Sequence, residues 1–245
     1  MSSKIITVWG GNNSGKSTFA TNLACALSAR DRLVGLISAN LVFGELQIFF
    51  GQNVPPEKGL FRALSEDNPN IGEKFVASGE SKNLFFLSVP TRYTGLLCDT
   101  VTLEQVEQMI NAASVAFDIL VIDGAAELTN PVSGVGLWLA ETICTLHRPS
   151  IAAQMWHQGV ADFVRELHIV EKQIHILQAP DGEFDDQTYR EMIGLSFPFE
   201  LPYVKRASEL QNAGTPLYFH RDRACRYYGK VLEQIADGIR GGGKP

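Results

Sequence analysis

Residues 10–17, GGNNSGKS, constrain the fold of this chain more than any other segment. Glycines at positions 10, 11 and 15 let the main chain take positive φ angles and approach a ligand closely. Backbone N–H groups at the start of a following helix attract anions, while a lysine and a serine at the end of this pattern reach terminal phosphates and bind Mg²⁺. The segment therefore predicts a phosphate-binding loop. Its expected ligand-binding residues are Gly10, Gly11, Asn12, Asn13, Ser14, Gly15, Lys16, Ser17 and Thr18.

The residues on either side of this loop fit the same interpretation. Residues 5–9 are an apolar run that predicts a buried strand, and residues 17–30 have the spacing of an amphipathic helix. A strand, a glycine-rich turn and a helix in this order place the amino terminus of the helix against the phosphates. The alternative, a glycine turn that contains a lysine by chance, is disfavoured by this context.

Short apolar segments alternate with helical patterns along the rest of the chain. We expect strands at residues 33–37, 83–89, 117–123, 141–147, 173–179 and 196–202, and helices at residues 59–66, 71–78 and 102–116. Apolar strands separated by helices are typical of a parallel sheet that helices cover on both faces. The prediction is an α/β fold with a mostly parallel, twisted sheet of about seven or eight strands. It forms a single domain over residues 1–240, with a flexible tail at residues 241–245.

Residues 117–123, FDILVID, end in Asp123 after an apolar run. In phosphate-loop enzymes an acid at the end of a neighbouring strand helps to hold the magnesium ion. Many such aspartates are plain helix caps or turn residues, but the phosphate loop favours the metal-binding role here. We therefore expect Ser17 and Asp123 to bind Mg²⁺.

Four segments together resemble the MinD/ParA group of deviant Walker ATPases, and within it the CpaE/TadZ-like pilus-assembly branch. The segments are residues 10–28, 34–51, 117–127 and 197–219, so the resemblance spans nearly the whole chain. It implies a P-loop NTPase fold, ATP and Mg²⁺ as cofactors, and a homodimer that the nucleotide stabilises. It also implies that Pro202, after a late strand, lies beside the adenine.

The sequence departs from this group at two places that concern hydrolysis. A signature lysine of the group stands where this chain has Gly11, and an Asp-x-Asp pair stands where it has Ser38-Ala39-Asn40. Asparagine orients a water molecule but does not accept its proton, and the loose transition state of phosphoryl transfer needs little help from a base. Lys16 and Asn40 are therefore the candidate catalytic residues, and we expect slow turnover.

Three functions are compatible with these features. The favoured one is an ATP-binding localisation or assembly factor of pilus or secretion machinery, with weak ATP hydrolysis. The second is a ParA-type partition ATPase that binds DNA through Arg221, Arg223 and Arg226, within a segment that carries six basic side chains against two acidic ones over residues 205–230. A solvated helix face explains that segment equally simply. The third is a scaffold that keeps the fold and has lost the nucleotide.

Composition and patterning place the chain in the cytoplasm. Its formal net charge of -6 disfavours non-specific nucleic-acid binding by the whole surface. No signal peptide and no membrane-spanning apolar run is present, so any recruitment to the inner face of the membrane depends on a protein partner. A stripe of apolar residues near the carboxyl end is expected to dock on the sheet rather than insert into lipid. Its members are Tyr228, Val231, Leu232, Ile235 and Ile239.

Two further sets of residues have plain structural interpretations. The four cysteines are far apart in the sequence, which favours free thiols in a reducing cytosol; they are Cys25, Cys98, Cys144 and Cys225. The apolar segment at residues 46–56 is expected to pack in the core through Leu46, Ile48 and Phe49. The alternative for this segment is an exposed patch that binds a partner.

Overall fold

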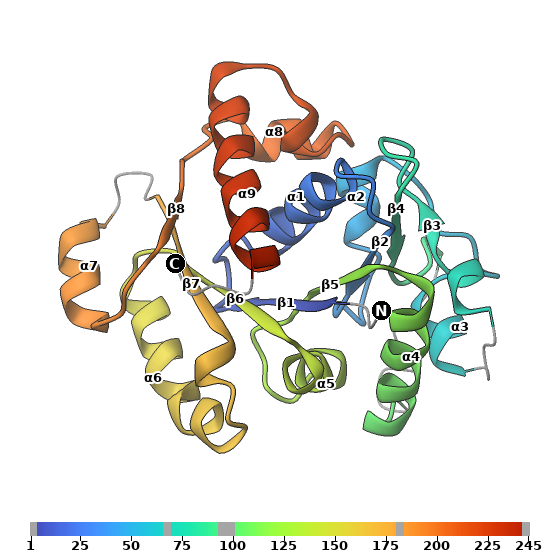
Figure 1. The fold of residues 1–245 in the computed structure, drawn as a ribbon, viewed down its shortest axis with the longest axis horizontal. Coiled ribbons are helices and arrows are strands. Elements are labelled where there is room, and N and C mark those ends of the chain that lie inside the picture. Colours follow the sequence, from blue (N-terminus) through green and yellow to red (C-terminus); the bar gives the residue numbers. More distant parts are fainter. Residues whose placement is uncertain (1–3, 66–69, 93–100, 180–183, 242–245) are drawn as a thin grey trace.

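The computed structural model describes residues 4–65, 70–92, 101–179 and 184–241, which form an α/β fold around one twisted sheet (Figure 1). In these residues the sheet has eight strands in the order β3-β4-β2-β5-β1-β6-β7-β8. The neighbouring strands are parallel except at the β3–β4 edge, where they are antiparallel. This architecture confirms the predicted fold class. The strands are β1 (Lys4–Gly10), β2 (Val34–Ser38), β3 (Val76–Ala77), β4 (Leu84–Leu87), β5 (Ile119–Asp123), β6 (Thr142–His147), β7 (Gln173–Gln178) and β8 (Phe199–Leu201).

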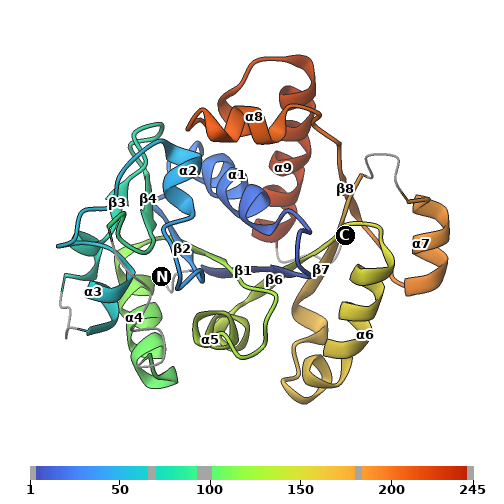
Figure 2. The same cartoon turned by 180° about the vertical axis from the view of Figure 1, so that it is seen from behind.

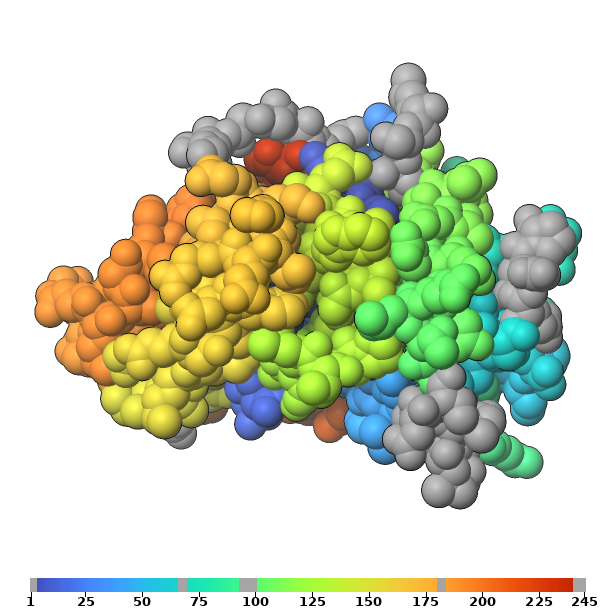
Figure 3. Space-filling view, turned by 90° about the horizontal axis from the view of Figure 1, so that it is seen from below, coloured from blue at the N-terminus to red at the C-terminus, as the bar shows by residue number. Residues whose placement is uncertain are grey.

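Helices cover both faces of the sheet, as Figures 1 and 2 show from opposite sides. One face carries α1 (Lys16–Ser28), α2 (Leu46–Phe50), α8 (Ala207–Asn212) and α9 (Arg223–Gly241). The opposite face carries α4 (Leu103–Ala116), α5 (Pro131–Leu139) and α6 (Ile151–Glu166), which lie side by side in Figure 3. Smaller elements at the edges are α3 (Leu60–Ser65), α7 (Asp186–Ile193) and the 3-10 turns η1 (Ile71–Lys74), η3 (Val170–Lys172) and η4 (Leu217–Phe219).

The central strands are apolar throughout because helices bury them on both sides. All five residues of β5 and all six residues of β6 are buried. The side chains divide into two apolar cores, one under α1 and α9 and the other under α4 and α5. Of the cysteines, Cys25, Cys144 and Cys225 are buried free thiols, whereas Cys98 lies outside the described residues.

The apolar stripe of α9 is buried, which confirms that it docks on the fold. Tyr228, Leu232 and Ile235 are at most 2% exposed and pack in the same core as α1. Lys4 donates a hydrogen bond to the main chain of α9 at Ile239. Among the helices that the structure describes, none has a stretch both long and apolar enough to span a bilayer. The expected tail lies outside the described residues except for Gly241, the last residue of α9.

Residues 71–78 correct the prediction of a helix. They form the short 3-10 turn η1 and then the strand β3, in which Val76 pairs with Phe86 of β4. Phe75, between the turn and the strand, is 1% exposed and its ring lies 4.6 Å from that of Phe117. A β-branched residue beside a buried aromatic favours cross-strand packing over a helix, and non-local contacts of this kind override local helical preference.

Candidate functional site

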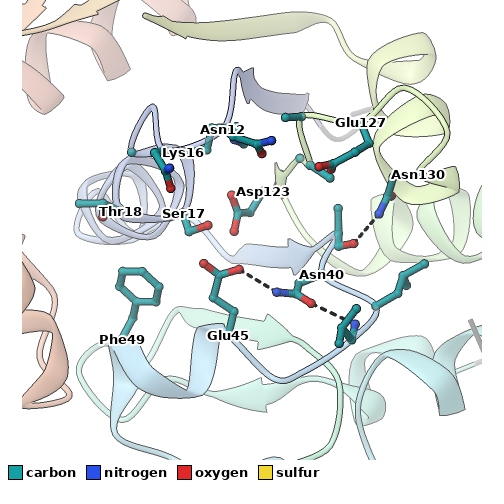
Figure 4. Close-up of a pocket in the computed structure, with 18 of the residues that line it drawn as sticks. Asn12, Lys16, Ser17, Thr18, Asn40, Glu45, Phe49, Asp123, Glu127 and Asn130 are labelled. Atoms are coloured by element: carbon teal, nitrogen blue, oxygen red, sulfur yellow. Dashed lines mark hydrogen bonds between the residues drawn. The ribbon is translucent and has the colours of Figure 1, made fainter. Parts of the chain in front are cut away.

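The carboxyl ends of β2, β5 and β1, which are adjacent in the sheet, define one cavity of about 800 Å³. The phosphate loop follows β1, Asp123 ends β5, and the loop that contains Asn40 follows β2. Ligands of open α/β sheets bind in a crevice of this kind, at the carboxyl ends of the strands. Figure 4 shows how side chains from the three segments face the same space.

The phosphate loop has the backbone that its glycines predict. Gly10 and Gly15 have φ angles of 152° and 85°, and Asn13 has a φ angle of 59°. A Cβ atom at Gly10 would lie 2.5 Å from the carbonyl oxygen of Leu146, so only glycine fits there. Gly15 directly precedes α1. The positive end of that helix therefore faces the cavity, where it favours an anion.

Most of the predicted loop residues line the cavity. They are Asn12, Asn13, Gly15, Lys16, Ser17 and Thr18. Gly10, Gly11 and Ser14 do not line the cavity, and Ser14 is 2% exposed. The Lys16 ammonium group donates a hydrogen bond of 2.8 Å to the carbonyl oxygen of Gly11. Burial lowers the pKa of Lys16, and the nearby charges of Asp123, Glu127 and Glu45 oppose that shift.

Asp123 is a buried carboxylate whose surroundings suit a cation. Its side chain is 4% exposed, and its Oδ1 atom has no hydrogen-bond partner among the described residues. Burial, followed by the charge of Glu45, raises the pKa of Asp123 to about 7, while a hydrogen bond with Ser17 and the charge of Lys16 lower it. A carboxylate with one unpaired oxygen beside a serine hydroxyl is the oxygen-rich surrounding that Mg²⁺ prefers.

The residues of the cavity fit a magnesium ion whose ligands come partly from the protein and partly from a polyphosphate. Within the described ranges, no group of three or more His, Cys, Asp or Glu side chains is arranged to hold a metal ion alone. Magnesium in nucleotide sites keeps several waters and takes one or two carboxylates plus phosphate oxygens. Ser17 and Asp123 would hold the ion, which would neutralise the phosphates.

Asn40 has a different environment from the one expected of a free water-orienting group. Its Oδ1 atom accepts hydrogen bonds from the main-chain N–H groups of Val42 (3.0 Å) and Phe43 (3.2 Å). Its Nδ2 atom donates to Oε2 of Glu45 at 3.1 Å. Asn40 thus fixes the loop after β2 and holds Glu45 in the cavity (Figure 4). Glu45 belongs to the segment at residues 34–51, but its sequence pattern does not mark it as a site residue.

Several solved structures have the same fold. The septum site-determining protein MinD of Pyrococcus horikoshii, complexed with Mg-ADP, is 17% identical, with a TM-score of 0.78 over 98% of each chain. A ParA family ATPase of Chlorobium tepidum is 18% identical, with a TM-score of 0.79 over 96% of this chain and 99% of that chain. A plasmid partition protein of Borrelia burgdorferi bound to AMPPNP is 18% identical, with a TM-score of 0.73 over 97% and 99%.

The chain has the MinD/ParA fold. No protein-family model matches the sequence, and no curated protein matches it. The likeness therefore rests on the arrangement of strands and helices and not on sequence identity.

In this chain the indole ring of Trp156 lies next to the phosphate loop, beside Gly11. A Cβ atom at Gly11 would lie 3.4 Å from Cγ of Trp156, a residue of α6. Trp156 donates a hydrogen bond of 3.3 Å to the carbonyl oxygen of Ala126, and its ring lies 4.8 Å from that of Trp9. Trp156 therefore lies between the phosphate loop and the loop that follows β5, next to Gly11, which stands where the group has its signature lysine.

A smaller cavity of about 240 Å³ lies beside the phosphate loop and includes Pro202 in its lining. Gly15, Thr18 and Arg148 line both cavities, so the two spaces are neighbours. The Thr18 hydroxyl accepts a hydrogen bond of 2.7 Å from Nε2 of Gln211 in α8. Pro202 lines this smaller cavity next to the phosphate loop and does not line the larger one, so its role as a neighbour of the adenine stays a prediction.

The basic segment of the chain forms a separate surface, which we call the α9 patch. Arg223, Arg226 and Lys230 line a cavity of about 780 Å³ together with Tyr203 and Tyr227. The two tyrosines are 48% and 59% exposed. In the residues that the structure describes, no acidic side chain lines this cavity. Arg221 is outside it, so only two of the three arginines predicted to bind DNA lie together.

Proposed function

We propose that this chain binds ATP with Mg²⁺ and works as a nucleotide-dependent localisation or assembly factor with slow ATP hydrolysis. The observation that supports this proposal most is the buried, unpaired Oδ1 atom of Asp123 beside Ser17 at the open end of α1. The main-chain amides of the loop and Lys16 would bind the phosphates, while Ser17 and Asp123 would hold the ion. The solved structures that bind Mg-ADP and AMPPNP on this fold support the choice of ligand.

The proposed machine is a pilus or secretion apparatus, and the proposed active form is a nucleotide-stabilised homodimer. The segment at residues 34–51 supports the first part through its resemblance to the CpaE/TadZ-like branch. Exposed apolar side chains near the cavity support the second part: Val42 is 68% exposed, Phe43 is 50% exposed and Ile48 is 45% exposed. A second copy across the nucleotide would cover them. The protein would act in the cytoplasm and reach the membrane through partners.

Thermal unfolding with and without ligand tests nucleotide binding. A ligand at 100 times its Kd stabilises the folded state by about 2.7 kcal/mol. We expect ATP with Mg²⁺ to raise the Tm of the wild-type protein and to leave the Tm of the Lys16→Ala variant unchanged. Equal Tm values for both proteins with and without ligand would instead support a nucleotide-free scaffold.

The α9 patch favours a second candidate, a partition ATPase that binds DNA non-specifically. Arg223 and Arg226 carry no ion pair or side-chain hydrogen bond within the described part of the chain, so their charges are available to phosphates. Filter binding of duplex DNA with ATP at two salt concentrations tests this candidate, because phosphate contacts weaken as salt rises. The Arg226→Ala variant should lose retention, while Arg221→Ala, outside the patch, should keep more of it. No retention by the wild-type protein rejects the partition function.

A further inference from the structure

We propose that Glu45 is the carboxylate that positions the attacking water for hydrolysis of the terminal phosphate, and that Asn40 positions Glu45. This chain has asparagine at position 40, and the carboxylate that faces the cavity is at position 45, directly before α2. This inference rests on the proposed nucleotide binding and goes beyond it, because it assigns a hydrolytic role to a residue that the sequence did not single out.

The placement of Glu45 comes from the loop after β2. Glu45 directly precedes α2 and lines the 800 Å³ cavity together with Lys16, Ser17 and Asp123. Its main-chain N–H donates to the carbonyl oxygen of Phe43 at 2.9 Å, which fixes the backbone at this point. Figure 4 shows its carboxylate directed toward Ser17 and Asp123.

Asn40 holds one oxygen of this carboxylate and leaves the other available. The Nδ2 atom of Asn40 donates to Oε2 of Glu45, and the Asn40 carbonyl oxygen is already bound by two main-chain N–H groups. The side-chain oxygen of Asn40 is therefore committed to the loop, and one of its two side-chain N–H groups is committed to Glu45. The Oε1 atom of Glu45 accepts no hydrogen bond from the residues that the structure describes. It is the free acceptor on this side of the cavity.

The unpaired oxygen of Asp123 shows independently that this space is built for a ligand. Its Oδ1 atom is buried and has no partner within the described ranges. Two carboxylates that face one cavity repel each other unless a cation or a proton donor lies between them. A metal-bound triphosphate and its attacking water supply both, and the water requires an acceptor on the side opposite the leaving group.

The proposed step balances with ATP and water as the reactants. The water oxygen forms a bond to the γ-phosphorus, and the bond from the γ-phosphorus to the β–γ bridging oxygen breaks, with its electron pair remaining on ADP. One water proton passes to the Glu45 carboxylate, which later releases it to solvent. Because the transition state is loose, the main contribution of Glu45 is to orient the water.

The Glu45→Gln variant tests this role, with Glu104→Gln as its matched control. Glutamine keeps an oxygen for the Asn40 amide but neither carries the charge nor accepts the proton. Glu104 is an exposed carboxylate in the first turn of α4 and does not line the cavity. We expect Glu45→Gln to lower phosphate release at saturating ATP and Mg²⁺ by about 10- to 100-fold, which is at or below the lower end of the usual range for general acid–base catalysis. Glu104→Gln should stay within about 3-fold of the wild type.

Nucleotide affinity is the readout that separates positioning of water from holding of the metal. The Kd of a fluorescent ATP analogue, measured with Mg²⁺ and with EDTA, should change by less than about 3-fold in Glu45→Gln. Asn40→Ala should lower turnover as well, and the double variant should be no slower than Glu45→Gln, because residues that act as one unit are not additive. A loss of affinity in Mg²⁺ alone would assign Glu45 to the metal and overturn the proposal.

Trapping of ADP with aluminium fluoride, a mimic of the transferring phosphate, covers the case of undetectable turnover. The wild-type protein should retain ADP in this complex, and Glu45→Gln should not, while both keep the same Tm without ligand. If the wild-type protein binds ATP with Mg²⁺ but neither hydrolyses it nor traps ADP, this inference fails and nucleotide binding stands. If the wild-type protein does not bind ATP at all, the proposed function fails first. Equal turnover in the Glu45→Gln and Glu104→Gln variants also overturns the inference.

Discussion

Single residues of the site differ in how far the sequence predicts them. Lys16 and Ser17 belong to one contiguous loop, so their neighbours in the chain are also their neighbours in space. Asp123 follows from strand order, because the end of a central strand must reach the same edge of the sheet. The role of Asn40 was harder to predict, because its hydrogen bonds depend on how the next few residues turn. Glu45 reaches the site because of that turn, and it belongs neither to the phosphate loop nor to the end of a strand.

The Asp123→Asn variant tests the cost of burying the Asp123 carboxylate. In the protein without ligand the carboxylate is buried and its pKa is raised to about 7, so its ionised form is disfavoured at neutral pH. We expect Asp123→Asn to raise the free energy of unfolding in urea by about 1–3 kcal/mol, because an amide carries no charge to desolvate. The same variant should lose stabilisation by ATP that depends on Mg²⁺. A less stable variant would show that Asp123 is already compensated.

Some elements form because they contact segments far away in the chain, and the sequence does not show these contacts. The strands were predictable from buried apolar runs, whereas β3 was not, because its pairing with β4 decides its structure. The histidines show the same limit. His147 of β6 and His175 of β7 are far apart in the chain, but the adjacent strands bring them within hydrogen-bond distance, with Nε2 of His147 3.1 Å from Nδ1 of His175.

These histidines make the stability of the β6–β7–α7 region depend on pH. Burial, then the charges of His175 and His157, lowers the pKa of His147 to about 3, and burial with His157 lowers the pKa of His175 to about 4. On the other side, Nδ1 of His147 lies 3.0 Å from the hydroxyl of Tyr189. The unfolded chain takes up protons below the ordinary pKa of 6.5, while the folded chain does not. Stability is therefore complete above pH 6.5 and falls as the pH decreases toward 4.

At pH 5 the expected loss is about 2 kcal/mol for each of the two buried histidines, relative to pH 7.5. Urea unfolding at a series of pH values measures it. The His175→Gln variant should show a smaller dependence on pH, because one of the two groups no longer titrates. His168→Asn is the control: His168 is exposed and has a φ angle of 53°, which asparagine tolerates. Equal pH profiles for the wild type and His175→Gln would contradict this account.

At the scale of the whole molecule, the exposed apolar side chains differ in where they lie. Val42, Phe43 and Ile48 belong to the loop after β2 and to α2, beside the nucleotide cavity. The prediction that Ile48 packs in the core was wrong, whereas Leu46 and Phe49 are buried as expected. Leu46 and Phe49 are three residues apart and share the face of α2 that meets the core, whereas Ile48 lies on another face of the helix. Ile48 remains on the surface with its apolar neighbours, which is the arrangement of a partner-binding patch.

If the proposed dimer forms, a second copy covers the patch of Val42, Phe43 and Ile48, and a charge placed there should prevent dimerisation. Phe43→Asp places a charge on a surface that a second copy would cover, and burying an unpaired charge is costly. In sedimentation velocity with ATP and Mg²⁺, the wild type should sediment as a dimer and Phe43→Asp as a monomer. Nucleotide affinity should change by less than about 3-fold, because Phe43 does not line the nucleotide cavity. Val115→Asp is the matched control, since Val115 is 89% exposed on α4, across the sheet from the cavity. If both variants dimerise as the wild type does, the two copies meet elsewhere. A wild type that stays monomeric with bound ATP shows instead that nucleotide binding alone does not bring two copies together.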